Sequence, residues 1–275
     1  MKEKETLSNA ANAHAADRRS FLKGAGMTGL GLAGAAMIGS KFSTSQQTVE
    51  AATAVSDIDI LNFALNLEYL EAEFYAKSTF GATLVQLGVI TAADESGPTT
   101  GGARVPNFAS SPAATMATAL RIDEIAHVKF LRAALGSRAV KKPAINLNAL
   151  GYGFSSVNSW LKLGRQFEDV GISAYLGAAP LITSKAYLAA AGAILATEAQ
   201  HSGSFRLICV MNGVSSPAVD SLDVPPTAKT LYDVDKNSLS IPRTTSQVLN
   251  IVYGGGRCSG GFYPNGMNGT IVCQS

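Results

Sequence analysis

Histidine and cysteine are scarce in this chain of 275 residues, which contains three of each. The cysteines lack the paired spacing of a zinc finger. The glycines form no phosphate-binding loop, and no nucleophile elbow is present. The weakly apolar stretch 24–39 is rich in glycine and too short to span a bilayer as a permanent anchor. These absences argue against several common classes of nucleotide-binding, hydrolytic and membrane-anchored protein.

The chain also lacks a marked excess of charge. Lys and Arg total 22 and Asp and Glu total 20, and six of the former and four of the latter lie within residues 1–54. Residues 55–275 therefore carry sixteen of each and are formally neutral. This balance indicates neither a nucleic-acid partner nor a charged membrane surface as a partner.

The first 54 residues are typical of an export signal. A twin-arginine pattern at residues 18–19 precedes the stretch 24–39, and the small residues 52–54 suit cleavage by signal peptidase. No cysteine lies near that site to carry a lipid. We therefore expect a periplasmic or secreted protein, exported by the twin-arginine pathway, whose mature part begins at Val55.

Four stretches rich in Ala and Leu predict helices, at residues 57–79, 112–135, 155–182 and 184–212. Proline interrupts none of their centres and occurs near the end of the third as Pro180. No alternating strand pattern competes, so we predict an all-α four-helix bundle over residues 55–213. We expect residues 214–275, with a short helix at 245–253, to pack on the bundle as an irregular extension.

The first two connections between these helices, residues 80–111 and 137–154, are long. Connections of this length inside a compact domain are usually functional or cover something. In the glycine-rich tail, Cys258 and Cys273 lie where a disulfide would persist outside the cytoplasm. The sequence does not fix their geometry, so their pairing stays open. We interpret Cys209, in an apolar stretch, as a small buried side chain.

The two histidines beyond residue 54 each close the same motif. Glu124 precedes His127 by three residues, and Glu198 precedes His201 by three. Residues three apart share one face of a helix, so each motif presents a carboxylate beside an imidazole. One Glu-x-x-His motif is a weak signal, but two of them on apolar faces are a strong one.

The first and third helices each place one glutamate, Glu68 or Glu168, within an apolar face. Burying an unpaired carboxylate costs several kcal/mol, so each needs a cation, a proton or a network. For Glu168 the competing interpretation is an ion pair with Arg165. Tyr75 and Tyr175 follow these glutamates by seven residues on the same faces. There they would hydrogen-bond the ligands or take part in electron transfer, or fill the core.

Two further glutamates of the first helix differ from Glu68. Glu71 lies at the edge of the apolar face, where it would bridge two ions or contact a ligand. Glu73 shares a polar face with Lys77, four residues later, and we predict that it is solvated.

Together these patterns predict a site for two metal ions. The predicted ligands are Glu68, Glu124, His127, Glu168, Glu198 and His201. Two Glu-x-x-His helices plus one glutamate from each of two others are the ligand set of di-metal carboxylate bundles. The order of the ligands also describes two copies of a helix pair, which gives each ion one histidine. Oxygen-rich ligands with one imidazole favour two iron or two manganese ions over copper. We expect Asp123 to orient an imidazole.

These residues resemble the ferritin-like superfamily. The run 61–75, which contains Glu68 and Tyr75, is similar to the branch that includes desiccation-related proteins, as are the tail segments 239–244 and 247–254. The resemblance covers about residues 56–256 and implies a ferritin-like bundle. In ferritin the long crossover joins the second and third helices, whereas here the first connection is long. This departure argues against cage assembly and bulk iron storage.

Three functional hypotheses follow. The first is redox chemistry on oxygen, peroxide or ferrous iron at two iron or manganese ions, with ferroxidase, peroxidase or catalase-like outcomes. The second is a non-catalytic stress or desiccation protein that sequesters metal, and the third is a metal-free structural bundle. The sequence leaves the metal, the physiological substrate and a homo-oligomeric assembly open.

Overall fold

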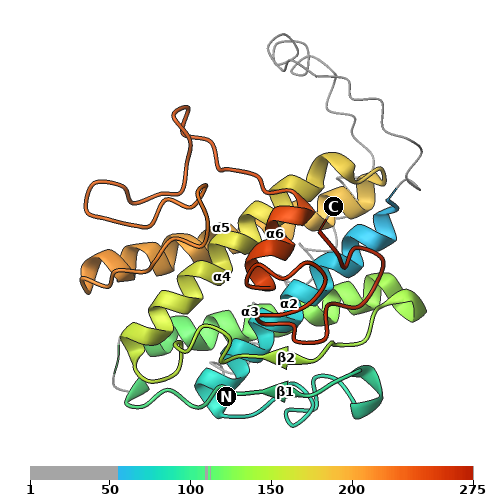
Figure 1. The fold of residues 1–275 in the computed structure, drawn as a ribbon, viewed down its shortest axis with the longest axis horizontal. Helices are drawn as coiled ribbons and strands as arrows, with labels where there is room; N and C mark the ends of the chain where they lie inside the picture. The colour runs from blue at the N-terminus through green and yellow to red at the C-terminus, as the bar shows by residue number, and fades with distance from the viewer. Residues whose placement is uncertain (1–54, 109–110, 112, 275) are drawn as a thin grey trace, which may run out of the picture. The chain divides into compact units, whose positions relative to one another are not determined.

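The computed structural model describes residues 55–108, 111 and 113–274. Four long helices form a bundle (Figure 1): α2 (Asp57–Phe80), α3 (Ala113–Leu135), α4 (Val157–Ala178) and α5 (Lys185–Met211). Helix α2 packs mainly on α3, and α4 mainly on α5, while the two pairs meet through α2 with α4 and α3 with α5. The predicted all-α four-helix bundle is confirmed.

The ends of the helices follow local sequence signals. Ser56 caps α2, and its side chain and that of Asp59 bond each other's backbone N–H. Helix α4 ends at Ala178, four residues before the predicted end. There Pro180, which has no N–H to donate, lies in the 3-10 turn Ala179–Leu181. Ser184 then caps α5.

The two long connections meet beside the bundle. Within them β1 (Thr99–Thr100) pairs in parallel with β2 (Ile145–Asn146). The buried amine of Lys142 donates to the carbonyl oxygen of Gly97 at 2.9 Å, which ties the second connection to the first. These contacts build a layer over one face of α2.

The irregular tail covers another face of α2. Helix α6 (Thr245–Val252) packs on α4. Beyond α6, the Tyr263 hydroxyl donates to the carbonyl oxygen of Asn66 at 2.7 Å. The Asn66 side chain donates to the backbone of Asn268 at 2.8 Å and accepts from it at 3.1 Å. A disulfide joins Cys258 to Cys273 and closes this segment into a loop. The contacts of Tyr263 and Asn268 with Asn66 hold the loop against α2.

Residues 214–243 are held to the bundle by buried arginines. Arg165 of α4 donates to Asp223 at 2.6 Å and to Asp169 at 3.2 Å. Arg206 of α5 donates to Asp169 and to the carbonyl oxygen of Val224, both at 2.6 Å. Paired and hydrogen-bonded charges of this kind tolerate burial.

Because two layers cover α2, the prediction that Glu73 is solvated is wrong. The Glu73 side chain is fully buried, and the backbone N–H of Leu84 donates to it at 3.3 Å. Burial raises the pKa of Glu73 to about 7, although Lys142 opposes the shift. The polar face of the helix therefore contacts polar groups of the two connections instead of solvent.

In the part of the chain that the structure describes, no helix has both the length and the apolarity needed to cross a membrane. The predicted export signal, residues 1–54, lies outside the described residues.

Candidate metal centre

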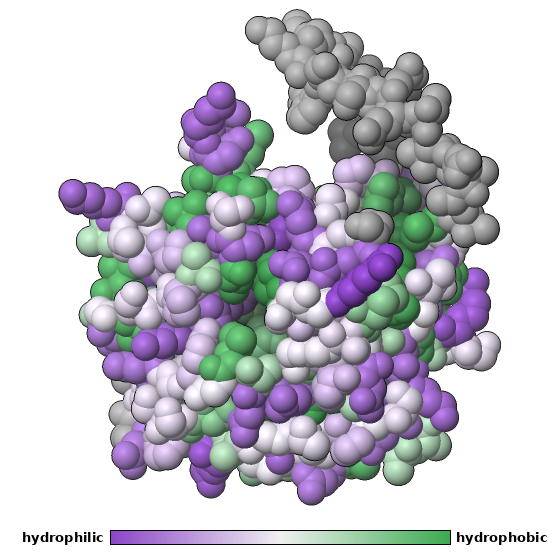
Figure 2. Space-filling model, in the orientation of Figure 1, coloured by the Kyte–Doolittle hydropathy of each residue, from purple (hydrophilic) through white to green (hydrophobic). Residues whose placement is uncertain are grey.

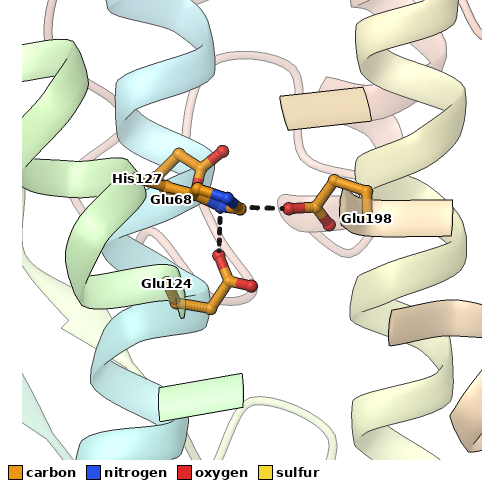
Figure 3. A group of neighbouring side chains, drawn as sticks. All are labelled: Glu68, Glu124, His127 and Glu198. Atoms are coloured by element: carbon orange, nitrogen blue, oxygen red, sulfur yellow. Dashed lines mark hydrogen bonds and ion pairs between the residues drawn. The ribbon is translucent and has the colours of Figure 1, made fainter. Parts of the chain in front are cut away.

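The six predicted ligands converge in the middle of the bundle as two overlapping groups. The first consists of Glu68, Glu124, His127 and Glu198, and the second of Glu124, Glu168, Glu198 and His201. In each group, one ligand atom from every residue lies within 4.8 Å of the others, and all six residues are buried. Figure 3 shows the first group, with Glu124 and Glu198 approaching His127 from different helices. The two groups share Glu124 and Glu198.

In the first group, three carboxylates surround one imidazole nitrogen. The Nδ1 atom of His127 lies 3.1 Å from Glu124 Oε2, 3.2 Å from Glu68 Oε2 and 3.3 Å from Glu198 Oε1. One N–H cannot donate well to three oxygens at once. The carboxylates are therefore arranged around a common point rather than as partners of His127 alone.

In the second group, the imidazole of His201 is held from both sides. Its Nδ1 atom lies 2.9 Å from Glu124 Oε1 and 3.2 Å from Glu168 Oε2. Its Nε2 atom lies 3.2 Å from Asp123 Oδ2, at the edge of the site. As expected from the sequence, Asp123 is placed to fix the ring, which leaves Nδ1 to face the carboxylates.

The two tyrosines bond the ligands reciprocally across the bundle. Tyr75 of α2 donates its hydroxyl hydrogen to Glu168 Oε1 on α4, and Tyr175 of α4 donates to Glu68 Oε1 on α2. The competing interpretation of Glu168, an ion pair with Arg165, is wrong because Arg165 bonds Asp169 and Asp223 instead. The internal repeat expected from the ligand order is therefore visible in the contacts.

Comparison with known proteins assigns the family. A family model described as a ferritin-like domain matches residues 56–210. This chain belongs to the ferritin-like family. It is also similar to the ferritin-like catalase Nec2 of Nesocodon mauritianus, at 24% identity over 272 residues, covering 79% of this chain and 85% of that protein. The resemblance to the ferritin-like superfamily is confirmed, and the narrower resemblance to desiccation-related proteins stays a prediction.

Burial and mutual repulsion perturb the acids of this ferritin-like centre. Burial, and then the charges of neighbouring glutamates, raise the pKa of Glu198 well above its usual range. Burial likewise raises the pKa of Glu124 to about 7. Burial alone would lower the pKa of His201, but the nearby carboxylates of Glu124 and Glu168 outweigh this effect and raise the pKa to about 12. The pKa of His127 is raised for the same reason, since carboxylates surround it as well. The centre therefore draws positive charge, as protons or as cations.

The oxygen and nitrogen atoms of the six side chains are better suited to binding cations than to binding protons alone. Four buried oxygens have no hydrogen-bond partner among the described residues: Glu68 Oε2, Glu124 Oε1 and both oxygens of Glu198. Three of them lie within 3.3 Å of an imidazole nitrogen, but at angles that make no hydrogen bond. Leaving a buried acceptor unsatisfied costs about 1–3 kcal/mol. Four ionised glutamates would balance two divalent cations, and oxygen ligands with imidazole suit iron or manganese.

Glu71 belongs to neither group. It is buried beside the centre, and burial, then the charge of Glu198, raises its pKa well above the usual range. This geometry favours a neutral acid near the ligands over a bridging ligand.

The structure also shows a third group of acidic side chains, which the sequence did not predict. Asp169, Asp223 and Asp233 lie together, but Arg165 and Arg206 already occupy the space between them. The available signal was the spacing of Arg165 and Asp169, four residues apart on one helix. The cluster attaches the tail to the bundle rather than offering a cation site.

Proposed function

We propose that the six converging side chains bind two iron or two manganese ions, one in each group, and that the protein acts on peroxide. The observation that carries the proposal is the sharing of Glu124 and Glu198 between two groups that each hold one histidine. When bound, two adjacent ions of this kind supply a two-electron redox couple for peroxide or oxygen.

The protein's own groups prepare the site. Tyr75 and Tyr175 bond the Oε1 atoms of Glu168 and Glu68, so the Oε2 atoms are the ones turned toward His201 and His127. Burial, followed by the charge of the bonded glutamate, raises the pKa of both phenols well above 10. Each phenol therefore keeps a proton at its oxygen, where it can be shared with a ligand. The dry interior excludes bulk water.

Peroxide is the substrate that the comparison favours, because the curated relative is named a catalase. Oxygen and ferrous iron are the other substrates that a pair of such ions handles. A non-catalytic protein that sequesters metal remains the alternative to be tested.

The test combines metal analysis with oxygen release from hydrogen peroxide. We expect about two equivalents of metal per chain, consistent with two four-residue groups, and release of oxygen by the loaded protein. The variant Glu68→Ala/Glu168→Ala should lose both. Glu73→Gln, which alters a buried glutamate outside the ligand groups, should retain both.

Each other outcome has a definite meaning. Two equivalents of metal without peroxide consumption above that of the double variant would support sequestration and refute the enzymatic proposal. A folded protein that takes up no iron or manganese would refute both, and leave a structural bundle.

We also propose export by the twin-arginine pathway. The order of signal features in residues 1–54 supports it, as does the disulfide between Cys258 and Cys273, a bond typical of compartments outside the cytoplasm. Replacing Arg18 and Arg19 with lysine should retain the protein in the cytoplasmic fraction, and unchanged export would contradict the proposal.

A further inference from the structure

A cavity of about 260 Å³ leads from the surface to the edge of the centre. It lies between α2, α4, α6 and three loops, and exposed residues such as Leu150, Ala218 and Gly255 form its rim. Figure 2 shows hydrophobic residues among polar ones on the face where α4 and α6 run in Figure 1. None of the six candidate ligands lines this cavity.

The inner end of the cavity touches the metal centre through a glycine. Gly171 lines the cavity, and a Cβ atom added to it would lie 2.8 Å from Glu198 Oε2 and 3.2 Å from Glu71 Oε1. A side chain at this position would therefore fill the space beside a shared ligand. Glu71, which is buried, lines the same end.

The lining specifies the chemistry of an occupant. Ten of its nineteen residues are Leu, Ile, Val or Phe, and neither Lys nor Arg is among them, so an anion gains nothing there. The Gln166 side chain is already engaged, because it accepts from Tyr152 and donates to the carbonyl oxygen of Pro217, both at 2.8 Å. Glu71 remains as the acid that can bond a guest.

The cavity is far larger than a peroxide molecule requires. A water molecule has about 30 Å³ of liquid volume, and peroxide has only two heavy atoms. Apolar walls would also offer few partners to a chain of waters. Largely apolar cavities with a few polar groups are typical of sites for organic ligands.

We propose that this cavity binds a neutral, largely apolar organic molecule whose one hydrogen-bonding group lies at Glu71, beside the metal centre. The inference goes beyond the proposed action on peroxide and does not require it. A molecule held there would lie beside Gly171, close to the carboxylate of Glu198.

The first experiment uses the fluorescent probe N-phenyl-1-naphthylamine with the full chain, both as purified and after chelation of metals. We expect saturable binding of one probe per chain. Ala218→Trp, which places a large ring at the rim, should weaken binding by about tenfold, roughly 1.4 kcal/mol. Met211→Trp is the matched control, since Met211 is exposed and lies outside the cavity lining. If Ala218→Trp fails to fold, Leu150→Trp blocks the rim from another loop.

The second experiment tests the polar end. In wild type, 1-naphthol should displace the probe at about fivefold lower concentration than naphthalene, which corresponds to one hydrogen bond of about 1 kcal/mol. In the Glu71→Leu variant, 1-naphthol and naphthalene should displace the probe at equal concentrations.

Absence of saturable binding, or equal binding by wild type and the rim variants, would overturn the proposal. A preference for naphthol that survives in Glu71→Leu would overturn the assigned orientation. None of these readouts depends on peroxide turnover, so this inference and the proposed function fail separately.

Discussion

Replacing the shared ligand Glu198 with glutamine should stabilise the metal-free protein while abolishing its stabilisation by metal. Both Glu198 oxygens are buried without hydrogen-bond partners, and burial and nearby glutamates raise its pKa well above the usual range. The ionised form is therefore unfavourable in the fold, and each pKa unit corresponds to about 1.4 kcal/mol. We expect Glu198→Gln to raise the free energy of unfolding by about 1–3 kcal/mol at pH 8.

The same substitution should remove the effect of the ions. Occupancy at one hundred times the dissociation constant adds about 2.7 kcal/mol for each site, or about 5 kcal/mol for two. Glu198 belongs to both groups, so its loss should weaken both sites. Urea unfolding with and without manganese measures both effects. The matched control Glu73→Gln should also stabilise the metal-free protein at pH 8, but it should keep the gain from metal.

Two results would refute this reasoning. One is a metal-free Glu198→Gln protein that is less stable than wild type by more than about 1 kcal/mol, a loss typical of broken favourable interactions. The other is an undiminished gain from manganese in the same variant.

Three further predictions concern other parts of the molecule. Because the pKa of Glu73 is raised to about 7, its contribution to stability should be lost as pH rises from about 4.5 to 7, and Glu73→Gln should remove this decline, at most about 3 kcal/mol in urea unfolding. Asp123→Asn should weaken manganese binding at the His201 group by about 10–100-fold in calorimetric titration, while the other group is retained. Cys258→Ser/Cys273→Ser should lower the free energy of unfolding by about 3 kcal/mol, since the bond closes a loop with a sequence separation of 15 residues; an unchanged denaturation midpoint would contradict this.

The six candidate ligands could be singled out from the sequence because their signals are local. The spacing of Glu124 to His127 and of Glu198 to His201 lies within one turn of a helix, and a helix face can be traced from neighbouring residues. The convergence of the six side chains follows once four such faces pack together. The same reasoning placed Tyr75 on the face of Glu68 and Tyr175 on the face of Glu168. Packing then supplied the reciprocal bonds, from Tyr75 to Glu168 and from Tyr175 to Glu68.

The burial of Glu73 and the cavity could not be predicted in this way. The backbone N–H of Leu84 donates to Glu73, and the charge of Lys142 lies near it. Both residues belong to irregular connections, whose course cannot be predicted from helical periodicity. The cavity draws residues from three helices and three loops between residues 67 and 262, so no single window of sequence contains it. Both features depend on long-range packing of irregular chain.

The two candidate ligand groups are related by an internal repeat, yet they are not equivalent. Asp123 precedes Glu124 and reaches Nε2 of His201, whereas the corresponding residue before Glu198 is Thr197, whose hydroxyl donates to the carbonyl oxygen of Ala193 in its own helix. A carboxylate partner makes an imidazole a more basic ligand. On the proposed function, an ion at His201 should therefore be held more tightly than an ion at His127. A pair with unequal affinities exchanges one ion more readily, and the position beside His127 is the one at which loss of metal would begin.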